Sequence, residues 1–378
     1  MNQMLTAPPP VAGEPQRAAF TGVRKTFARL VSRGAGLELV TAGFYRFWLA
    51  TDMRRHLWSH TVIDGDAFEY TGRAKELLIG FLVAMAILTP LYVGYFVLGI
   101  EAERLQNFAS TPLFLFFYVF GQFAIYRARR YRLTRTVWRG VRFWMDGSGW
   151  GYAVRAVLWS LFVLVTFGLA LPWREAALER YKMRHSHYGD LQGSFQGTGW
   201  QLFKRGWGLW LVSPFALLII PAPFIYAAYK AIVWKWWLEG IRFGDVSLKS
   251  DLPTDALMSL YWKAVGWMVL AAVGLGIYSG AAVAFYGLLT GASLTQLVSG
   301  GSLLAAAPLI AIYGVGYLVT IFAVNIVIRL YLFHDVWQRV VSSLTVDRLD
   351  AAANVAAKGE LSNALGEGLA DGLDVGGF

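Results

Sequence analysis

The chain contains no cysteine, and acidic residues are scarce: its 378 residues include 24 Asp and Glu against 34 Lys and Arg. The absence of cysteine excludes disulfide bonds and thiolate catalysis. Charged residues make up only 15% of the chain, whereas 56% of it is hydrophobic and 16% is aromatic. A soluble domain is typically about 45–50% apolar. The first sixteen residues have no apolar stretch, so the sequence predicts no cleavable signal peptide.

The apolar residues are concentrated in four runs without charge, at residues 77–100, 207–229, 264–290 and 302–328. Each run is about long enough to cross a hydrocarbon core of roughly 30 Å. A fifth run, 111–126, is shorter. The net charge of +10 could indicate nucleic-acid binding. The basic residues, however, lie at the ends of the apolar runs, where they orient a membrane protein. The sequence therefore predicts a multi-pass protein of a bacterial inner membrane, with no nucleic-acid partner.

One motif recurs just after the apolar segments and indicates an internal repeat. The copies share basic residues followed by Gly and Phe at matching spacings. The first copy has Arg54, Arg55, Thr61, Gly65, Phe68 and Gly72, and the second has Arg129, Arg130, Thr136, Gly140, Phe143 and Gly147. A third copy is shorter, with Arg180, Arg184, Gly193, Phe195 and Gly199, and a fourth keeps Trp234, Gly240, Arg242 and Phe243.

The motif predicts a small β-hairpin after each helix. Asp64-Gly65 lies between β-prone residues, which is a hairpin signal. A lone hairpin is marginally stable, so we expect the hairpins to pair into one sheet at the membrane surface. The predicted fold is a predominantly α-helical polytopic membrane protein, with repeated transmembrane or re-entrant helices joined by small cytoplasmic β-hairpins. Its predicted domains are a disordered N-terminus (1–18), a membrane domain of about four helix–hairpin repeats (19–345) and an acidic Gly/Ala-rich tail (346–378).

The positive-inside rule places the basic hairpins and the carboxy terminus in the cytoplasm. All hairpins can lie on the cytoplasmic side of the membrane only if segments 28–50 and 152–173 enter the membrane and return, or lie in the interface. Full crossings are the alternative. Segment 207–229 contains three prolines and is expected to be broken. Glu38 and Arg46 are spaced to share one face of a helix within the first segment.

Two alternatives remain for the tail after residue 346. Its Gly, Ala and acidic residues are typical of a disordered, solvated segment. The acidic side chains Glu367, Asp371 and Asp374 could instead dock on the basic hairpins and neutralise them.

The motifs resemble the YjgN family of bacterial inner-membrane proteins. The resemblance rests on Thr41-Ala42-Gly43-Phe44-Tyr45-Arg46-Phe47-Trp48, followed by Arg55-His56-Leu57-Trp58 and Thr61. It also rests on Phe68-Glu69-Tyr70-Thr71-Gly72 with Glu76-Leu77, and on the tail from Gly366 to Val375. It spans about residues 18–376. Ala42 departs from the Leu expected there. The family is a domain of unknown function, so the resemblance supplies no residue roles. It implies one partner, a membrane-associated zinc metallopeptidase.

No group of residues indicates an enzyme. His185 and His187 offer too few ligands for zinc, and no nucleophile is grouped with a base. We expect no catalytic residue, no metal and no cofactor. The prediction is a protein that binds or translocates lipid or another anionic solute, because the planar guanidinium of Arg suits phosphate. The alternative is a membrane scaffold or regulator of a protein partner. The predicted partners are anionic lipids, a membrane protein or a second copy of the chain.

The candidate anion-binding residues are arginines near the ends of the apolar segments. If the repeats surround a common centre, the recurring ones among them would converge at the cytoplasmic face. They are Arg46, Arg54, Arg55, Arg129, Arg130, Arg174, Arg180 and Arg184.

Overall fold

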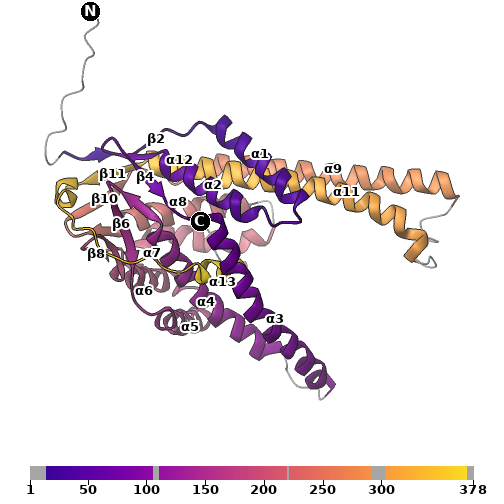
Figure 1. Cartoon of the computed structure of the whole chain (residues 1–378), viewed down its shortest axis with the longest axis horizontal. Helices are drawn as coiled ribbons and strands as arrows, with labels where there is room; N and C mark the ends of the chain where they lie inside the picture. Colours follow the sequence, from indigo (N-terminus) through magenta and orange to yellow (C-terminus); the bar gives the residue numbers. More distant parts are fainter. Residues whose placement is uncertain (1–13, 105–109, 219–220, 292–302, 373–378) are drawn as a thin grey trace, which may run out of the picture.

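The computed structural model describes residues 14–104, 110–218, 221–291 and 303–372. Its central feature is a sheet of eleven short strands (Figure 1). Hairpins supply eight of them, each with a three-residue and a five-residue strand: β3 (Thr61–Ile63) and β4 (Asp66–Tyr70), β5 (Thr136–Trp138) and β6 (Val141–Met145), β7 (Ser186–Tyr188) and β8 (Leu191–Phe195), β9 (Ile241–Phe243) and β10 (Val246–Ser250). The prediction that the hairpins pair into one sheet is confirmed. The third hairpin is as long as the others, so the expectation of a shorter copy is wrong.

The chain ends close this sheet into a ring. β1 (Gln16–Arg17) pairs with β11 (Leu344–Asp347), and β2 (Ala19–Phe20) pairs with β3, so one extended segment joins the two edges of the ladder. Ala18, between them, donates its N–H to the carbonyl of Leu344 at 2.9 Å. Edge strands expose unpaired backbone groups, and closure removes them. β1 lies inside the predicted disordered N-terminus, and β11 crosses the domain boundary predicted at 346.

The side chains of the ring alternate between a packed interior and a polar exterior. Residues from strands all around the ring, among them Ile63, Trp138, Tyr188 and Val346, form one buried cluster. Their neighbours along the strands point outward and are mostly polar, for example Glu69, Arg142, Gln192, Arg242 and Lys249. Alternation with period two is what a sheet with one buried face requires. The interior of the ring is therefore a hydrophobic core.

A pair of helices precedes each hairpin, and we call the pair with its hairpin a unit. The second helix of each unit packs on the second strand of its hairpin. The pairs are α1 (Arg24–Val40) and α2 (Arg46–Ser59), α3 (Ala74–Arg104) and α4 (Ser110–Thr134), α5 (Gly149–Val165) and α6 (Leu171–Arg184), α7 (Gly199–Val212) and α8 (Ala222–Gly240). Before β11 come α9 (Met258–Thr290), α11 (Leu303–Val327), a π-helical turn η2 (Ile328–Asp335) and α12 (Val336–Ser342).

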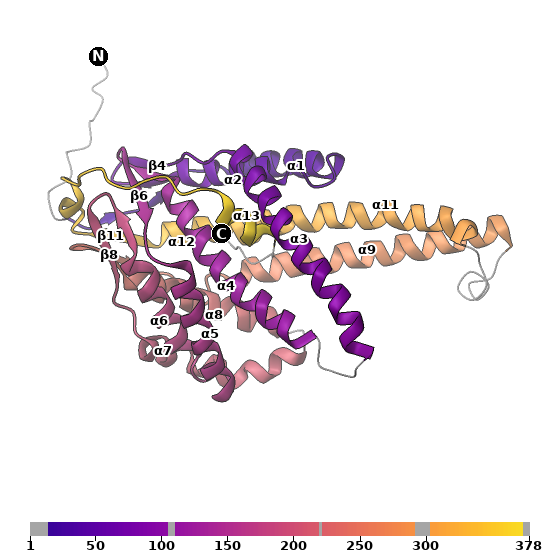
Figure 2. The same cartoon turned by 60° about the horizontal axis from the view of Figure 1, so that its bottom comes forward.

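Three helical segments among the described residues are long and apolar enough to cross a membrane: Ala74–Gly99, Met258–Thr290 and Ala307–Ser342. The pair α9–α11 extends away from the ring as one arm, and α3 and α4 form another (Figures 1 and 2). Few residues of these spans are buried in the monomer. Exposed apolar helices of this length are typical of lipid contact.

The segments 28–50 and 152–173 are not single helices. Each reverses at a tight turn, after Val40 in the first and after Val165 in the second, and the helices on either side pack together. Both turns use two consecutive residues with positive φ, Ala42-Gly43 and Phe167-Gly168. The reversal lets consecutive hairpins reach the same sheet. That these segments enter the membrane and return, or lie in the interface, stays a prediction. Segment 207–229 is broken as predicted, by a 3₁₀ turn at Ser213–Leu218.

The reversal also corrects the expected relation between Glu38 and Arg46. They lie on different helices, because α1 ends at Val40 and α2 begins at Arg46. The Glu38 carboxylate pairs with Arg329 on η2 at 2.8 Å. The guanidinium of Arg46 lies over the ring of Phe81 on α3, 4.4 Å from its centroid. Helical spacing had placed the two on one face only under the assumption of a continuous helix.

Candidate anion-binding site

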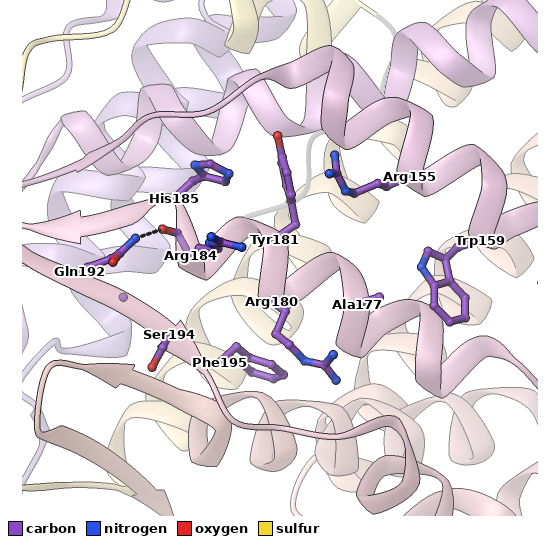
Figure 3. Close-up of a pocket in the computed structure, with 11 residues that line it drawn as sticks. Arg155, Trp159, Ala177, Arg180, Tyr181, Arg184, His185, Gln192, Ser194 and Phe195 are labelled. Atoms are coloured by element: carbon purple, nitrogen blue, oxygen red, sulfur yellow. Dashed lines mark hydrogen bonds between the residues drawn. The ribbon is translucent and has the colours of Figure 1, made fainter.

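An open pocket of about 710 Å³ lies between α5, α6 and β8 (Figure 3). Arg155 and Trp159 contribute from α5, and β8 provides the floor. The remaining lining comes from α6 and the residue after it: Ala177, Arg180, Tyr181, Arg184 and His185. We call this cavity the Arg pocket, because three guanidinium groups and no carboxylate line it.

The three arginines differ in how they are held. Arg155 donates to the carbonyl of Gly151 at 2.8 Å, and its guanidinium lies 4.6 Å from the ring centroid of Tyr181. Arg180 and Arg184 are one helical turn apart on α6 and exposed, with no acidic partner in the described part of the chain. Adjacent like charges repel unless an anion neutralises them. The pocket is thus electrostatically suited to an anion.

The walls of the pocket are fixed by local contacts. Tyr181 donates its hydroxyl hydrogen to the carbonyl of Ser148, the N-cap of α5, at 2.9 Å. Gln192 on β8 donates to the carbonyl of Arg184 at 2.8 Å. Gly193 lets β8 approach the end of α6 closely, because a Cβ there would collide with the carbonyls of Met183 and Ser186. These contacts position the pocket before any ligand arrives.

An apolar surface adjoins the pocket. The ring of Trp159 packs against Phe162 on the next turn of α5, with centroids 5.9 Å apart. Phe162 is 53% exposed, and Leu158 and Leu161 beside it are also exposed. A Trp next to exposed aliphatic residues is typical of the membrane–water interface. The pocket therefore combines cationic groups with a neighbouring surface suited to acyl chains.

Two other predicted arginines, Arg129 and Arg54, are partly or fully buried and paired with carboxylates. Arg129 on α4 lies 3.1 Å from the carboxylate of Glu179, which also contacts Lys182 and accepts from Trp237 Nε1 at 3.0 Å. Burial alone would raise the pKa of Glu179, but the charges of Lys182 and Arg129 and the hydrogen bonds of Lys182 and Trp237 lower it to about 2. This carboxyl group is therefore ionised at neutral pH.

Arg54 lies in a similar environment. It pairs with Glu367 of the carboxy-terminal tail and donates to the hydroxyl of Tyr70 at 3.2 Å. Burial favours a lower pKa for Arg54, but the negative charge of Glu367 and the contact with Tyr70 raise it. The docked alternative for the tail is the one that the structure shows. Of the predicted tail acids, the side chain of Asp371 and all of Asp374 lie outside what the structure describes.

The eight predicted arginines do not share one centre. Arg180 and Arg184 line the Arg pocket, whereas Arg55 donates to the carbonyl of Gly72 at 2.9 Å. Arg174 pairs with Glu175 at 2.6 Å. Arg130 faces a smaller cavity, of about 320 Å³. The arginines separate because α6 turns Arg180 outward while Glu179, its neighbour, points into the helix bundle.

Sequence reasoning missed Arg155, Trp159 and Tyr181. Arg155 did carry a signal, as a lone charge within an apolar segment, which is a common mark of a functional position. Trp159 and Tyr181 carried none, because aromatic residues are frequent throughout this chain.

A protein-family model described as "Bacterial protein of unknown function (DUF898)" matches residues 15–231. The match covers the first three units, including the Arg pocket, then α7 and about the first half of α8. No curated protein and no solved structure matches the chain.

Proposed function

Because the chain belongs to the DUF898, or YjgN, family of bacterial proteins of unknown function, we propose a function from the pocket itself. The protein is a non-enzymatic protein of the inner membrane that binds a phosphate-bearing anion in the Arg pocket. The ligand that fits best is an anionic phospholipid, with its phosphate at Arg155, Arg180 and Arg184 and its acyl chains along α5. The single observation that supports this most is the pair Arg180 and Arg184, which are exposed beside an apolar surface and have no acidic partner among the described residues.

The chemistry favours phosphate over other anions. A guanidinium makes two parallel hydrogen bonds to phosphate oxygens, and charge-assisted hydrogen bonds are about twice as strong as neutral ones. Translocation through the ring is less well supported than binding, because aromatic residues such as Trp138 and Phe143 fill its interior. We therefore propose binding.

The test uses the double variant Arg180→Ala/Arg184→Ala, with Arg29→Ala/Arg33→Ala as its control. Arg29 and Arg33 are also exposed and one turn apart, on α1, but line neither of the two cavities described above. The purified proteins are loaded with phosphatidylglycerol or phosphatidylcholine, and retained lipid is measured by native mass spectrometry. Losing two charge-assisted contacts should reduce retained phosphatidylglycerol at least about tenfold, with no change in the control.

Two outcomes bear on the identity of the ligand. If inorganic phosphate at millimolar concentration displaces the lipid completely, a soluble phosphate compound is the ligand. Equal retention of phosphatidylglycerol by wild type and the Arg180/Arg184 variant would refute the proposal.

The orientation is tested separately. We expect the ring to face the cytoplasm, because the basic residues gather around it. Gln196→Cys and Thr254→Cys, both exposed near the ring, should be protected from impermeant thiol reagents in intact cells. Thr290→Cys, at the far end of α9, should react. The native chain has no cysteine, so each variant carries a single thiol. Labelling of Gln196→Cys from outside would reverse the orientation.

A further inference from the structure

The unit that precedes the one with the Arg pocket has a related groove, between α4 and β6. Arg130 precedes β5 by the same distance as Arg180 precedes β7, and Trp144 and Met145 match Ser194 and Phe195. In this unit the carboxy-terminal tail forms part of the groove. The cavity of about 320 Å³ beside Arg130 and Trp144 is closed on one side by Lys358, Gly359 and Glu360.

These residues belong to a strap, residues 353–364, that leaves the ring after β11 and crosses its outer surface (Figure 2). Ala356 donates its N–H to the Asp190 carboxylate at 3.1 Å, and Gly359 packs against the ring of Trp144. Arg135 donates to the carbonyl of Ser362 at 3.3 Å. Most strap side chains are nevertheless exposed, Leu361 at 57%.

The strap leads into the tail helix α13 (Leu365–Gly372), which packs between α3 and α4. The backbones of Gly368 and Gly80 are in direct contact, since a Cβ on Gly368 would collide with Gly80. Leu369 and Ala370 are buried in a cluster with Ala84, Ala124 and Ala128. An isolated helix of two turns is not stable in water, so α13 depends on this groove for its structure.

Glu367 of α13 repeats the arrangement seen around Glu179. Glu179 lies between Arg129 of the preceding unit and Lys182 of its own. Glu367 lies between Arg54, the equivalent of Arg129, and Arg132, the equivalent of Lys182, with 3.4 Å to Arg132 Nε. The side chains of Arg54 and Arg132 are buried, at 8% and 16% exposure. At the position that Glu179 occupies in α6, α4 has Arg129, so the carboxylate at this place comes from the tail.

We infer that Arg54 and Arg132 form a second anion site, that the tail helix occupies it with Glu367, and that an anionic lipid headgroup at the membrane surface displaces the tail. The inference depends on the proposed function only for the class of ligand, a phosphate-bearing headgroup. Its chemical basis is that a phosphate accepts the same guanidinium donors as a carboxylate. Displacement is possible without unfolding the ring because the tail follows the last strand.

The test reports on the tail in the full-length protein. Leu361→Cys carries a spin label on the strap, and Thr254→Cys carries the control label on an exposed loop elsewhere. Each labelled protein is placed in nanodiscs of phosphatidylcholine alone or with phosphatidylglycerol. We expect phosphatidylglycerol to raise the mobile fraction at position 361 at least threefold and to leave position 254 unchanged. Inorganic phosphate without anionic lipid tests whether a soluble ion suffices to release the tail.

Variants then assign the effect to the site. Glu367→Gln should lower the phosphatidylglycerol content needed for release severalfold, whereas Glu360→Gln, which removes a charge from the exposed strap, should not. Arg180→Ala/Arg184→Ala should leave the release intact, which separates this inference from the Arg pocket. A label at 361 that responds identically to both lipids overturns the inference. The comparison of the two lipids needs no variant of Glu367, so it tests the inference even if Glu367→Gln fails to fold.

Discussion

Replacing Glu179 with Gln tests whether the buried charge network holds the helix bundle together. The substitution preserves shape and still allows an oxygen to accept from Trp237. It removes the negative charge that faces Arg129 and Lys182, and Glu179 is only 8% exposed. The variant would therefore leave two partly buried cations without their carboxylate.

Two independent arguments give the size of the effect. Removing one partner of a buried ion pair typically costs about 3–5 kcal/mol. The lowering of the Glu179 pKa from 4.5 to about 2 corresponds to about 3 kcal/mol, at roughly 1.4 kcal/mol per pH unit. We therefore expect Glu179→Gln to lower the free energy of unfolding by about 3 kcal/mol at pH 7.

The control is Glu239→Gln. Glu239 pairs with Arg205 at 2.7 Å, but both side chains are substantially exposed, so its loss should cost less than about 1 kcal/mol. Unfolding in detergent is followed by tryptophan fluorescence. A carboxyl group with a lowered pKa stabilises the fold above its unfolded pKa, and this is lost as the pH falls. The gap between wild type and Glu179→Gln should thus shrink between pH 4.5 and about 2. Equal effects of the two substitutions, or a gap independent of pH, would refute the reasoning.

Three further predictions concern stability in the same assay. Ala18→Pro removes the N–H that donates to the carbonyl of Leu344 where the ring closes, and it should lower the free energy of unfolding by about 2 kcal/mol or more. The control Glu14→Pro, before β1, should lower it little. Equal effects would mean that closure of the ring contributes nothing to stability. At Gly140 an added Cβ meets open space, but φ is +74°, so Gly140→Ala should lower the free energy of unfolding by about 1 kcal/mol. Gly206 also has open space but lies within α7, so Gly206→Ala should raise the free energy of unfolding by up to about 1 kcal/mol. Effects of the same sign would contradict the turn geometry. Burial and the nearby His60 and His334 lower the pKa of His56 from 6.5 to about 4. The free energy of unfolding should therefore fall by up to about 1.4 kcal/mol per pH unit as the pH drops from 6.5 to 4. His56→Phe should flatten this slope.

The hairpins could be predicted because their signals are local. Asp64-Gly65 turns with φ of +51° and +78°, as Asp-Gly turns between strands commonly do. The closure of the ring could not be predicted. β1 and β2 have two residues each, and nothing within two residues indicates which edges they will join. Their pairing is decided by the positions of β3 and β11, far apart in the chain.

Helical spacing was an unreliable guide wherever a helix reversed. Glu38 and Arg46 have a spacing compatible with one face, yet a turn with positive φ at Ala42 and Gly43 separates them. Positive φ is unusual for a residue with a Cβ, so Ala42 gave no warning. The matching turn at Phe167-Gly168 shows that a Gly after an arbitrary residue suffices here.

The charges of the recurring helices explain why the arginines did not converge and why the tail is needed. At equivalent positions α2 has Arg54, α4 has Arg129 and α6 has Glu179. Each Arg requires an acid from the next unit, and Arg129 finds one in Glu179. Arg54 faces α4, which offers an Arg at that position, so the acid must come from elsewhere, and Glu367 provides it. The repeated basic residues alone predict a common anion site, but α6 carries the opposite charge at the equivalent position. The carboxylate of the tail is thus the counterpart of Glu179, and this equivalence, more than the acidity of the tail as a whole, accounts for its docking between α3 and α4.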